Sequence, residues 1–157
     1  MAIAAVMGIT PTEVHDTPEF QLGQLGAIID DTNGTRIYKY LQYDTGSAGA
    51  AAVAGEVAYY YTLDGYKTFK VTSDLSDSVE VGAGVIQAVM TDGQYGWFQV
   101  SGAATLTISL TAGADGDPLT PTGAADGTLD VSADVTDNVC AIAGDISDKE
   151  IICMFPL

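Results

Sequence analysis

The sequence predicts an all-β protein, a small antiparallel barrel or sandwich with an extended N-terminal arm. Three observations support this fold class. Short runs of β-branched and aromatic residues recur about every eight to twelve residues, with turn-forming residues between them. The chain has 18 glycines among 157 residues, which argues against long helices. Hydrophobic residues make up 47% of the chain, enough for a substantial core.

The hairpin pattern is clearest in residues 84–100. Two runs rich in Val, Ile and aromatic residues flank a short glycine-containing stretch, which predicts antiparallel strands over residues 84–90 and 95–101. Trp97, the single tryptophan, follows the turn. We expect its ring to anchor the core while its N–H stays near water. Contact with a ligand is the alternative role.

An alternating run over residues 36–44 predicts a strand. On this strand Lys39 shares its face with apolar residues such as Ile37 and Leu41. The preceding Asn33-Gly34 pair is typical of a tight turn.

A second hairpin is predicted from residues 56–62 and 66–72, joined around Leu63-Asp64-Gly65. Six of the eight tyrosines lie between Tyr38 and Tyr61. Such a concentration is typical of core or rim packing, and it also suits a hydrated contact with another protein.

The second half of the chain continues the β pattern. An acidic turn precedes the residue 84–90 strand, an alternating run follows the hairpin, and a turn-rich stretch leads to three final strands. The expected elements are an acidic turn at 73–80, strands at 104–110, 128–132, 138–143 and 150–155, and turns at 111–127.

Two parts of the chain differ in character. Residues 1–30 have little periodicity and contain Pro11 and Pro18, so we expect an extended arm. The arm could add a strand to another protein's sheet, remain a flexible terminus, or fold back on its own domain. The β domain then spans residues 31–157, and it can be divided into a hairpin subdomain at 36–72 and a barrel at 83–157.

The formal net charge of −16 excludes some classes of binding partner. With only five Lys and Arg residues the chain lacks the basic patch that binds nucleic acid or an anionic membrane. Residues 71–148 hold twelve acidic residues and no basic one, which predicts a solvated outer surface. The apolar residues 1–9 lack a basic leader and are too short to span a bilayer, so we expect synthesis in the cytosol.

The motifs that could carry chemistry are incomplete. Residues 44–47 read Asp-Thr-Gly-Ser, as in aspartic proteases, but that mechanism needs two carboxylates and no second copy is present; we expect a turn that ends a strand. Asp115, Asp117 and residues 126–130 resemble calcium-loop fragments, but Leu119 occupies the position of a third ligand. We therefore expect no metal, no cofactor and no enzymatic activity.

The single histidine and the two cysteines are the remaining candidates for chemistry. His15 lies in the proline-containing arm, where we expect it to be solvated. Cys140 and Cys153 lie on the last two predicted strands and could be neighbours across the ladder. For a chain made in a cytosol we favour buried free thiols over a disulfide.

From Gly84 onward the order of elements resembles the head-decoration, or capsid cement, proteins of tailed bacteriophages. The resemblance covers about half of the chain. It lies in a Gly-Val-Ile-Gln-Ala strand followed by a glycine turn, and then in the segments 96–102, 112–119, 126–129, 139–143 and 151–155.

The resemblance implies a non-enzymatic virion protein on the capsid exterior, made in the host cytoplasm. It would bind the major capsid protein as a homotrimer and bridge neighbouring capsid subunits, with the N-terminal arm pairing with capsid strands. Two other classes stay open: a receptor- or glycan-binding module using Tyr59 to Tyr61 or Trp97, and a tail-tube or connector subunit. The arm residues expected to touch the capsid are Thr10, Pro11, Thr12, Val14, Pro18, Phe20 and Leu22.

Overall fold

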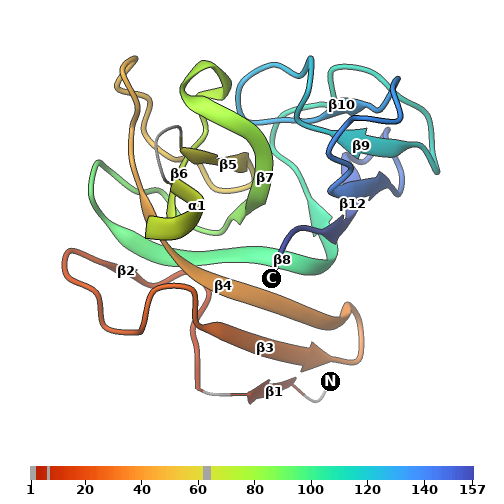
Figure 1. The fold of residues 1–157 in the computed structure, drawn as a ribbon. Coiled ribbons are helices and arrows are strands. Elements are labelled where there is room, and N and C mark those ends of the chain that lie inside the picture. The colour runs from red at the N-terminus through yellow and green to blue at the C-terminus, as the bar shows by residue number, and fades with distance from the viewer. Residues whose placement is uncertain (1–2, 7, 62–64) are drawn as a thin grey trace.

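The computed structural model describes residues 3–6, 8–61 and 65–157, and its centre is a closed five-stranded β-barrel (Figure 1). The strands follow the order β4–β6–β5–β7–β8, and β8 pairs back onto β4 to close the barrel. This confirms the predicted all-β class. The barrel strands are β4 (Gly34–Tyr43), β5 (Val57–Tyr61), β6 (Lys70–Thr72), β7 (Ser78–Ile86) and β8 (Tyr95–Thr105).

Two sheet extensions leave the barrel on opposite sides of the β4–β8 pair (Figure 1). The N-terminal flank, residues 3–30, extends from β4 through β3 to β1, and its short β2 pairs with the start of β8. The C-terminal flank, residues 106–157, extends from β8 through β12, β11, β9 and β10. Their strands are β1 (Ile3–Val6), β2 (Val14–His15), β3 (Leu25–Asp30), β9 (Pro118–Thr120), β10 (Asp130–Val131), β11 (Ala141–Ala143) and β12 (Glu150–Met154).

The N-terminal flank differs from the expected arm. β3 pairs with β4 in antiparallel register from Leu25 opposite Lys39 to Asp30 opposite Gly34. The Asn33-Gly34 turn joins these two strands, and Gly34 takes a positive φ of 67° that glycine adopts without strain. Backbone groups of an extended segment need partners, and here β4 and β8 supply them within the chain. Of the three states left open for residues 1–30, the fold-back onto the domain is the one found over the described residues.

The described part of the chain packs around three hydrophobic clusters. One lies between the barrel and the C-terminal flank, one fills the barrel around Tyr60 and Phe98, and the third joins the N-terminal flank to the outer side of β4 and β8 around Trp97. The tyrosine-rich region is core: five of its members are at most 1% exposed, namely Tyr38, Tyr40, Tyr43, Tyr59 and Tyr60. Their rings give the clusters large apolar contact areas.

The second predicted hairpin is formed with one difference. β5 and β6 pair antiparallel, with Tyr60 opposite Val71, but Gly65–Thr68 form a short helix, α1, between them. Leu63 and Asp64 of the predicted turn lie outside the described residues. β6 also runs parallel to the end of β4, and this pairing helps to close the barrel.

The hairpin over residues 84–101 has the predicted pairing but a longer connection. β7 and β8 are antiparallel, with Val85 opposite Gln99. β7 ends at Ile86 and begins at Ser78, inside the segment expected to be an acidic turn. Met90 makes an isolated bridge to Ala52 instead of extending β7.

The predicted strand at residues 104–110 is wrong after Thr105, where β8 ends. The alternation nevertheless sets burial, since Leu106 is buried while Ile108 and Leu110 are half-buried. The backbone beyond Thr105 bonds to loops instead of a neighbouring strand; for example, the Leu106 N–H donates to the Lys149 carbonyl. Period-two patterning therefore predicted the buried face but not the ladder.

Candidate functional site

The seven residues expected to touch a capsid all lie in the N-terminal flank, and three of them pack onto the hydrophobic clusters. Val14 packs against the barrel cluster, and Phe20 and Leu22 pack against the cluster around Trp97. Three of the seven are exposed, namely Thr10, Thr12 and Pro18, and four are half-buried, namely Pro11, Val14, Phe20 and Leu22. Only the first group presents its side chains fully to a partner in this conformation.

His15 is not solvated, contrary to expectation. Its side chain is only 11% exposed, and Nδ1 lies 2.8 Å from the Tyr40 hydroxyl. Nε2 lies 3.5 Å from a Glu19 carboxylate oxygen. The cause is β2, which pairs His15 with Tyr95 and so places the ring over the aromatic cluster.

Trp97 anchors that cluster, as predicted. The Phe20 and Tyr40 rings each lie 5.1 Å from its own, centroid to centroid, in edge or tilted arrangements. Its N–H does not reach water: Nε1 is buried and has no hydrogen-bond partner among the described residues. Tyr59 and Tyr60 are also fully buried. The aromatic rings named for a sugar-binding groove are therefore inside the protein, Tyr61 alone being half-buried.

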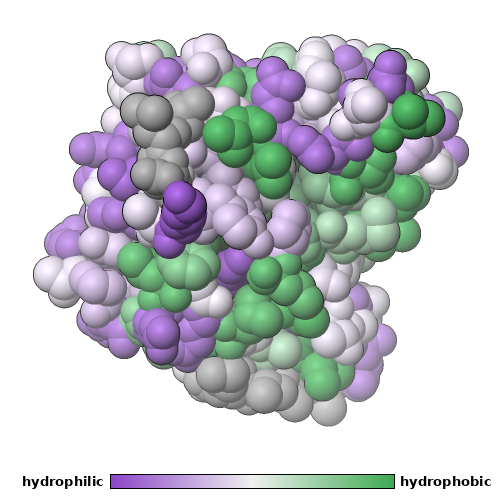
Figure 2. Space-filling model, in the orientation of Figure 1, coloured by the Kyte–Doolittle hydropathy of each residue, from purple (hydrophilic) through white to green (hydrophobic). Residues whose placement is uncertain are grey.

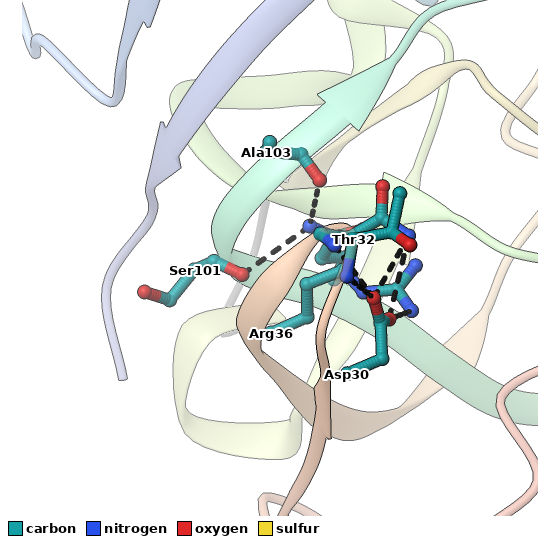
Figure 3. Close-up of polar contacts among 7 residues, drawn as sticks. Asp30, Thr32, Arg36, Ser101 and Ala103 are labelled. Atoms are coloured by element: carbon teal, nitrogen blue, oxygen red, sulfur yellow. Dashed lines mark hydrogen bonds and ion pairs between the residues drawn. The ribbon is translucent and has the colours of Figure 1, made fainter. Parts of the chain in front are cut away.

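The tip of the β3–β4 hairpin is held by the Asp30 carboxylate (Figure 3). It accepts hydrogen bonds from the backbone N–H groups of Asn33 (2.5 Å) and Thr32 (2.9 Å), and from the Arg36 guanidinium (2.6 Å). These donors, the Asn33 N–H foremost, hold the pKa of the Asp30 carboxyl below its ordinary value, although burial opposes the shift. The ion pair thus fixes the extension that carries β3 and β1.

A polar cavity of about 260 Å³ lies beside this tip. Gln99, 3% exposed, donates from Nε2 to the carbonyls of Ala103 (2.8 Å) and Ser101 (3.3 Å) (Figure 3). The polar side chains that line the cavity are Asn33, Arg36, Gln87, Gln99, Thr105 and Glu150. They include no histidine, cysteine or lysine. Arg36 pairs with Asp30 through Nη2, while its buried Nε has no hydrogen-bond partner among the described residues, so the cavity suits a small polar group.

A second cavity, of about 430 Å³, contains a buried lysine. Lys39 is 3% exposed, and its Nζ donates to the Tyr60 hydroxyl at 3.0 Å. The ammonium lies 5.5 Å from the centroid of the Phe69 ring and 5.8 Å from that of Tyr66. Burial lowers the pKa of the Lys39 amine. We call this site the Lys39 cavity; it is lined by Gly23, Leu25, Lys39, Tyr66, Lys67, Phe69 and Leu157.

The sequence contains one signal for this cavity, the position of Lys39 on its strand. Lys39 is in phase with apolar residues on its strand, a position where a lysine is rarely left unless it is buried or partnered. Tyr66 and Phe69 come from α1 and the following loop, and Tyr60 comes from β5; sequence spacing alone does not place these rings near Lys39. The β4–β6 and β5–β6 pairings together do so.

The motifs set aside in the sequence take structural roles in turns. The Asp44 carboxylate accepts the Gly46 N–H at 2.9 Å just after β4 and pairs with Lys70 at 3.3 Å. Asp117 accepts the Ala114 N–H at 2.8 Å in a similar turn. Among the described residues, no three His, Cys, Asp or Glu side chains are grouped to hold a metal ion. No helix of the described chain is both long enough and apolar enough to cross a membrane.

The fold and these sites define a small β-barrel with two sheet extensions, a polar cavity, the Lys39 cavity and acidic turns. Comparison with known proteins adds no family to this description. No family model matches the chain, and no match was found among curated proteins or among solved structures.

Proposed function

We propose that this protein is a structural virion component that binds the exterior of a phage capsid and bridges neighbouring capsid subunits as a homotrimer. The resemblance of residues 84–155 to head-decoration proteins suggests the class. The observation that carries the proposal is the outer edge of the N-terminal flank, where β1 ends the sheet.

β1 is suited to pairing with a strand of another protein. It pairs on one side with β3, from Ile3 opposite Asp30 to Val6 opposite Ala27, and no other described strand pairs with it. Natural edge strands are commonly protected by charge or proline, yet residues 1–9 contain neither. An unprotected edge on a chain of net charge −16 favours strand addition to a specific partner.

The rest of the molecule is compatible with an exposed position on a shell. The C-terminal flank, which holds nine of the 21 acidic residues and one basic residue, extends from the opposite side of the β4–β8 pair (Figure 1). Contact through β1 would leave that acidic flank facing solvent. Repetition of a modest contact over a symmetric shell gives strong overall binding.

The test is a pair of proline substitutions in β1, Ala4→Pro and Ala5→Pro, mixed with expanded, undecorated capsids. Successive N–H groups of an edge strand point alternately to its neighbour and away from it. One substitution therefore removes a hydrogen bond to β3, and the other removes only an outward N–H. Thermal unfolding identifies the outward variant, which keeps the wild-type Tm.

We expect the outward variant to lose capsid binding by at least about tenfold, since an outer strand hydrogen bond is lost and the ring clashes with an added strand. Cosedimentation with capsids measures this. If the outward variant bound capsids as tightly as the wild-type protein, the role of β1 would be contradicted. The proposed function itself would be contradicted if the wild-type protein bound no such capsid. It would also be contradicted if the protein occupied the shell as single copies instead of trimers.

A further inference from the structure

The Lys39 cavity contains an ammonium that forms no ion pair with any residue the structure describes. The ion pairs found among the described residues include those of Arg36 with Asp30, Lys70 with Asp44, and His15 with nearby glutamates. None of them includes Lys39, although the chain has 21 acidic residues. Burial of an ammonium is costly unless a partner compensates it.

The compensation inside the protein is incomplete. Lys39 Nζ uses one of its three N–H donors on the Tyr60 hydroxyl. The rings of Tyr60, Tyr66 and Phe69 lie 5.5–5.8 Å away and supply cation–π attraction. Rings stabilise the charge but accept no strong hydrogen bond, so an anionic acceptor in the cavity would complete the site.

The local backbone is held in an unusual conformation around this lysine. Phe69, whose ring faces Lys39, has a positive φ of 56°, which residues other than glycine rarely adopt. Its ring lies so close to Gly23 that a Cβ at position 23 would fall 2.5 Å from Phe69 Cε1. Strained positions of this kind concentrate at binding sites.

The cavity has an apolar wall as well as a cation. Leu25, Phe69 and Leu157 line it, and Tyr66 and Leu157 are 55% and 62% exposed at its rim. On the face drawn in Figure 2, apolar side chains gather around the C-terminus near α1 and β4. Lys67 provides a second cation among the lining residues.

From this combination we infer that the Lys39 cavity binds a small monocarboxylate with an apolar chain, its carboxylate on the Lys39 ammonium and its chain along Leu25, Phe69 and Leu157. The volume of about 430 Å³ admits a chain of about six carbons. This site is independent of the β1 edge and of the capsid proposal.

The experiment is a titration of the full chain with sodium hexanoate, followed by amide chemical shifts and calorimetry. Three matched probes separate the contributions: acetate keeps the charge without the chain, 1-hexanol keeps the chain without the charge, and hexylamine reverses the charge. We expect saturable binding of hexanoate at millimolar concentration and at least about tenfold weaker binding of each other probe.

A readout independent of any variant is the Lys39 amine itself. Because a bound carboxylate favours the charged form, hexanoate should raise the pKa of Lys39, followed through its side-chain nitrogen resonance. Hexanol should not raise it. A Lys39 that titrates identically with and without hexanoate would overturn the inference.

Substitutions test the same contact. Lys39→Met keeps a long apolar side chain and should make hexanoate bind no better than hexanol. Lys70→Met, outside the cavity, should leave hexanoate binding unchanged.

If Lys39→Met does not fold, Tyr66→Ala serves instead, because the exposed Tyr66 ring can be removed without opening the core. This variant should weaken hexanoate binding several-fold. The site would be refuted if hexanoate bound no better than hexanol, or no better than acetate. It would also be refuted if the variants bound hexanoate like the wild type, or if binding did not saturate by about 20 mM.

Discussion

The two flanks of the barrel are built by different means. The N-terminal flank has one long register against β4 and is fastened by aromatic rings, with Phe20 packed against Trp97 and Tyr40. The C-terminal flank has strands of two to five residues joined by turns that aspartates hold. Asp145 and Asp137 each accept several hydrogen bonds within their own turn.

The difference gives the acidic composition a structural meaning. Many carboxylates of the C-terminal flank are turn acceptors, and their donors lower the pKa of Asp137 and Asp145. The negative charge is therefore used locally as well as displayed outward. It follows that the N-terminal flank should be sensitive to lost ring volume and the C-terminal flank to acid.

The largest effect is expected from Trp97→Ala. Trp97 is 1% exposed at the centre of the cluster that holds the N-terminal flank. Removal of the indole leaves a cavity, and we expect the free energy of unfolding in urea to fall by about 3–5 kcal/mol. Amide exchange should speed up first in residues 14–30.

Trp97→Phe is the matched control. It keeps an aromatic ring against Phe20 and Tyr40 and removes an N–H that has no partner among the described residues. The loss of unfolding free energy should be well below that of Trp97→Ala. Phe keeps most of the ring contacts, and the N–H that it removes has no partner to lose. Equal losses for the two variants would show that ring packing does not hold this flank.

The longer strands of the sheet could be predicted from periodicity. The predicted strand at 36–44 is β4, Gly34–Tyr43, and the last predicted strand at 150–155 is β12, Glu150–Met154. Both alternate over enough residues for the pattern to be distinctive. The two- and three-residue strands β2, β9 and β10 carry no such pattern, because a few residues cannot show a period.

The sequence does not predict the N-terminal flank, for a different reason. The Asn33-Gly34 pair predicts a turn, but the prolines before Leu25–Asp30 favour an extended arm over that segment. The same turn directly before the strand at 36–44 is also typical of a hairpin, which is what the structure contains. The contacts of His15 and Lys39 arise from pairings distant in sequence, which composition and spacing do not encode.

A smaller effect is expected at the turn that begins with Asp145. Its Oδ1 accepts hydrogen bonds from the Ser147 hydroxyl (2.5 Å) and N–H (2.9 Å), and these lower the pKa of the carboxyl below 3.8. A carboxyl whose folded pKa is lowered contributes its stability above the unfolded pKa and loses it as the pH falls through the folded value. Protection of the turn amides should therefore fall below about pH 4.

Asp145→Asn should lower that protection at neutral pH and remove its dependence on acid. Asp148→Asn is the control in the same turn, because Asp148 contributes its backbone N–H to Asp145. Amide exchange between pH 2 and pH 6 makes the comparison. An unchanged acid dependence in Asp145→Asn would assign it to another group.

The smallest effect on the fold concerns the two thiols, which are free and buried as predicted. Cys153 on β12 lies opposite Ala141, the residue after Cys140. Burial raises the pKa of the Cys153 thiol to about 12 and that of Cys140 further. Because the thiolate is the reactive form, labelling by a disulfide reagent at pH 8 should be slowed on the order of a thousandfold relative to the unfolded chain.

Thiol labelling also sharpens the contrast between the flanks, because both cysteines belong to the C-terminal one. Trp97→Ala, which loosens the N-terminal flank, should leave both thiols protected as long as the barrel stays folded. Asp145→Asn, at a turn between β11 and β12, should raise the labelling rate of Cys153 modestly, through local opening. Faster labelling in Trp97→Ala than in Asp145→Asn, under conditions where both variants are folded, would mean that the flanks open together and are not separate units.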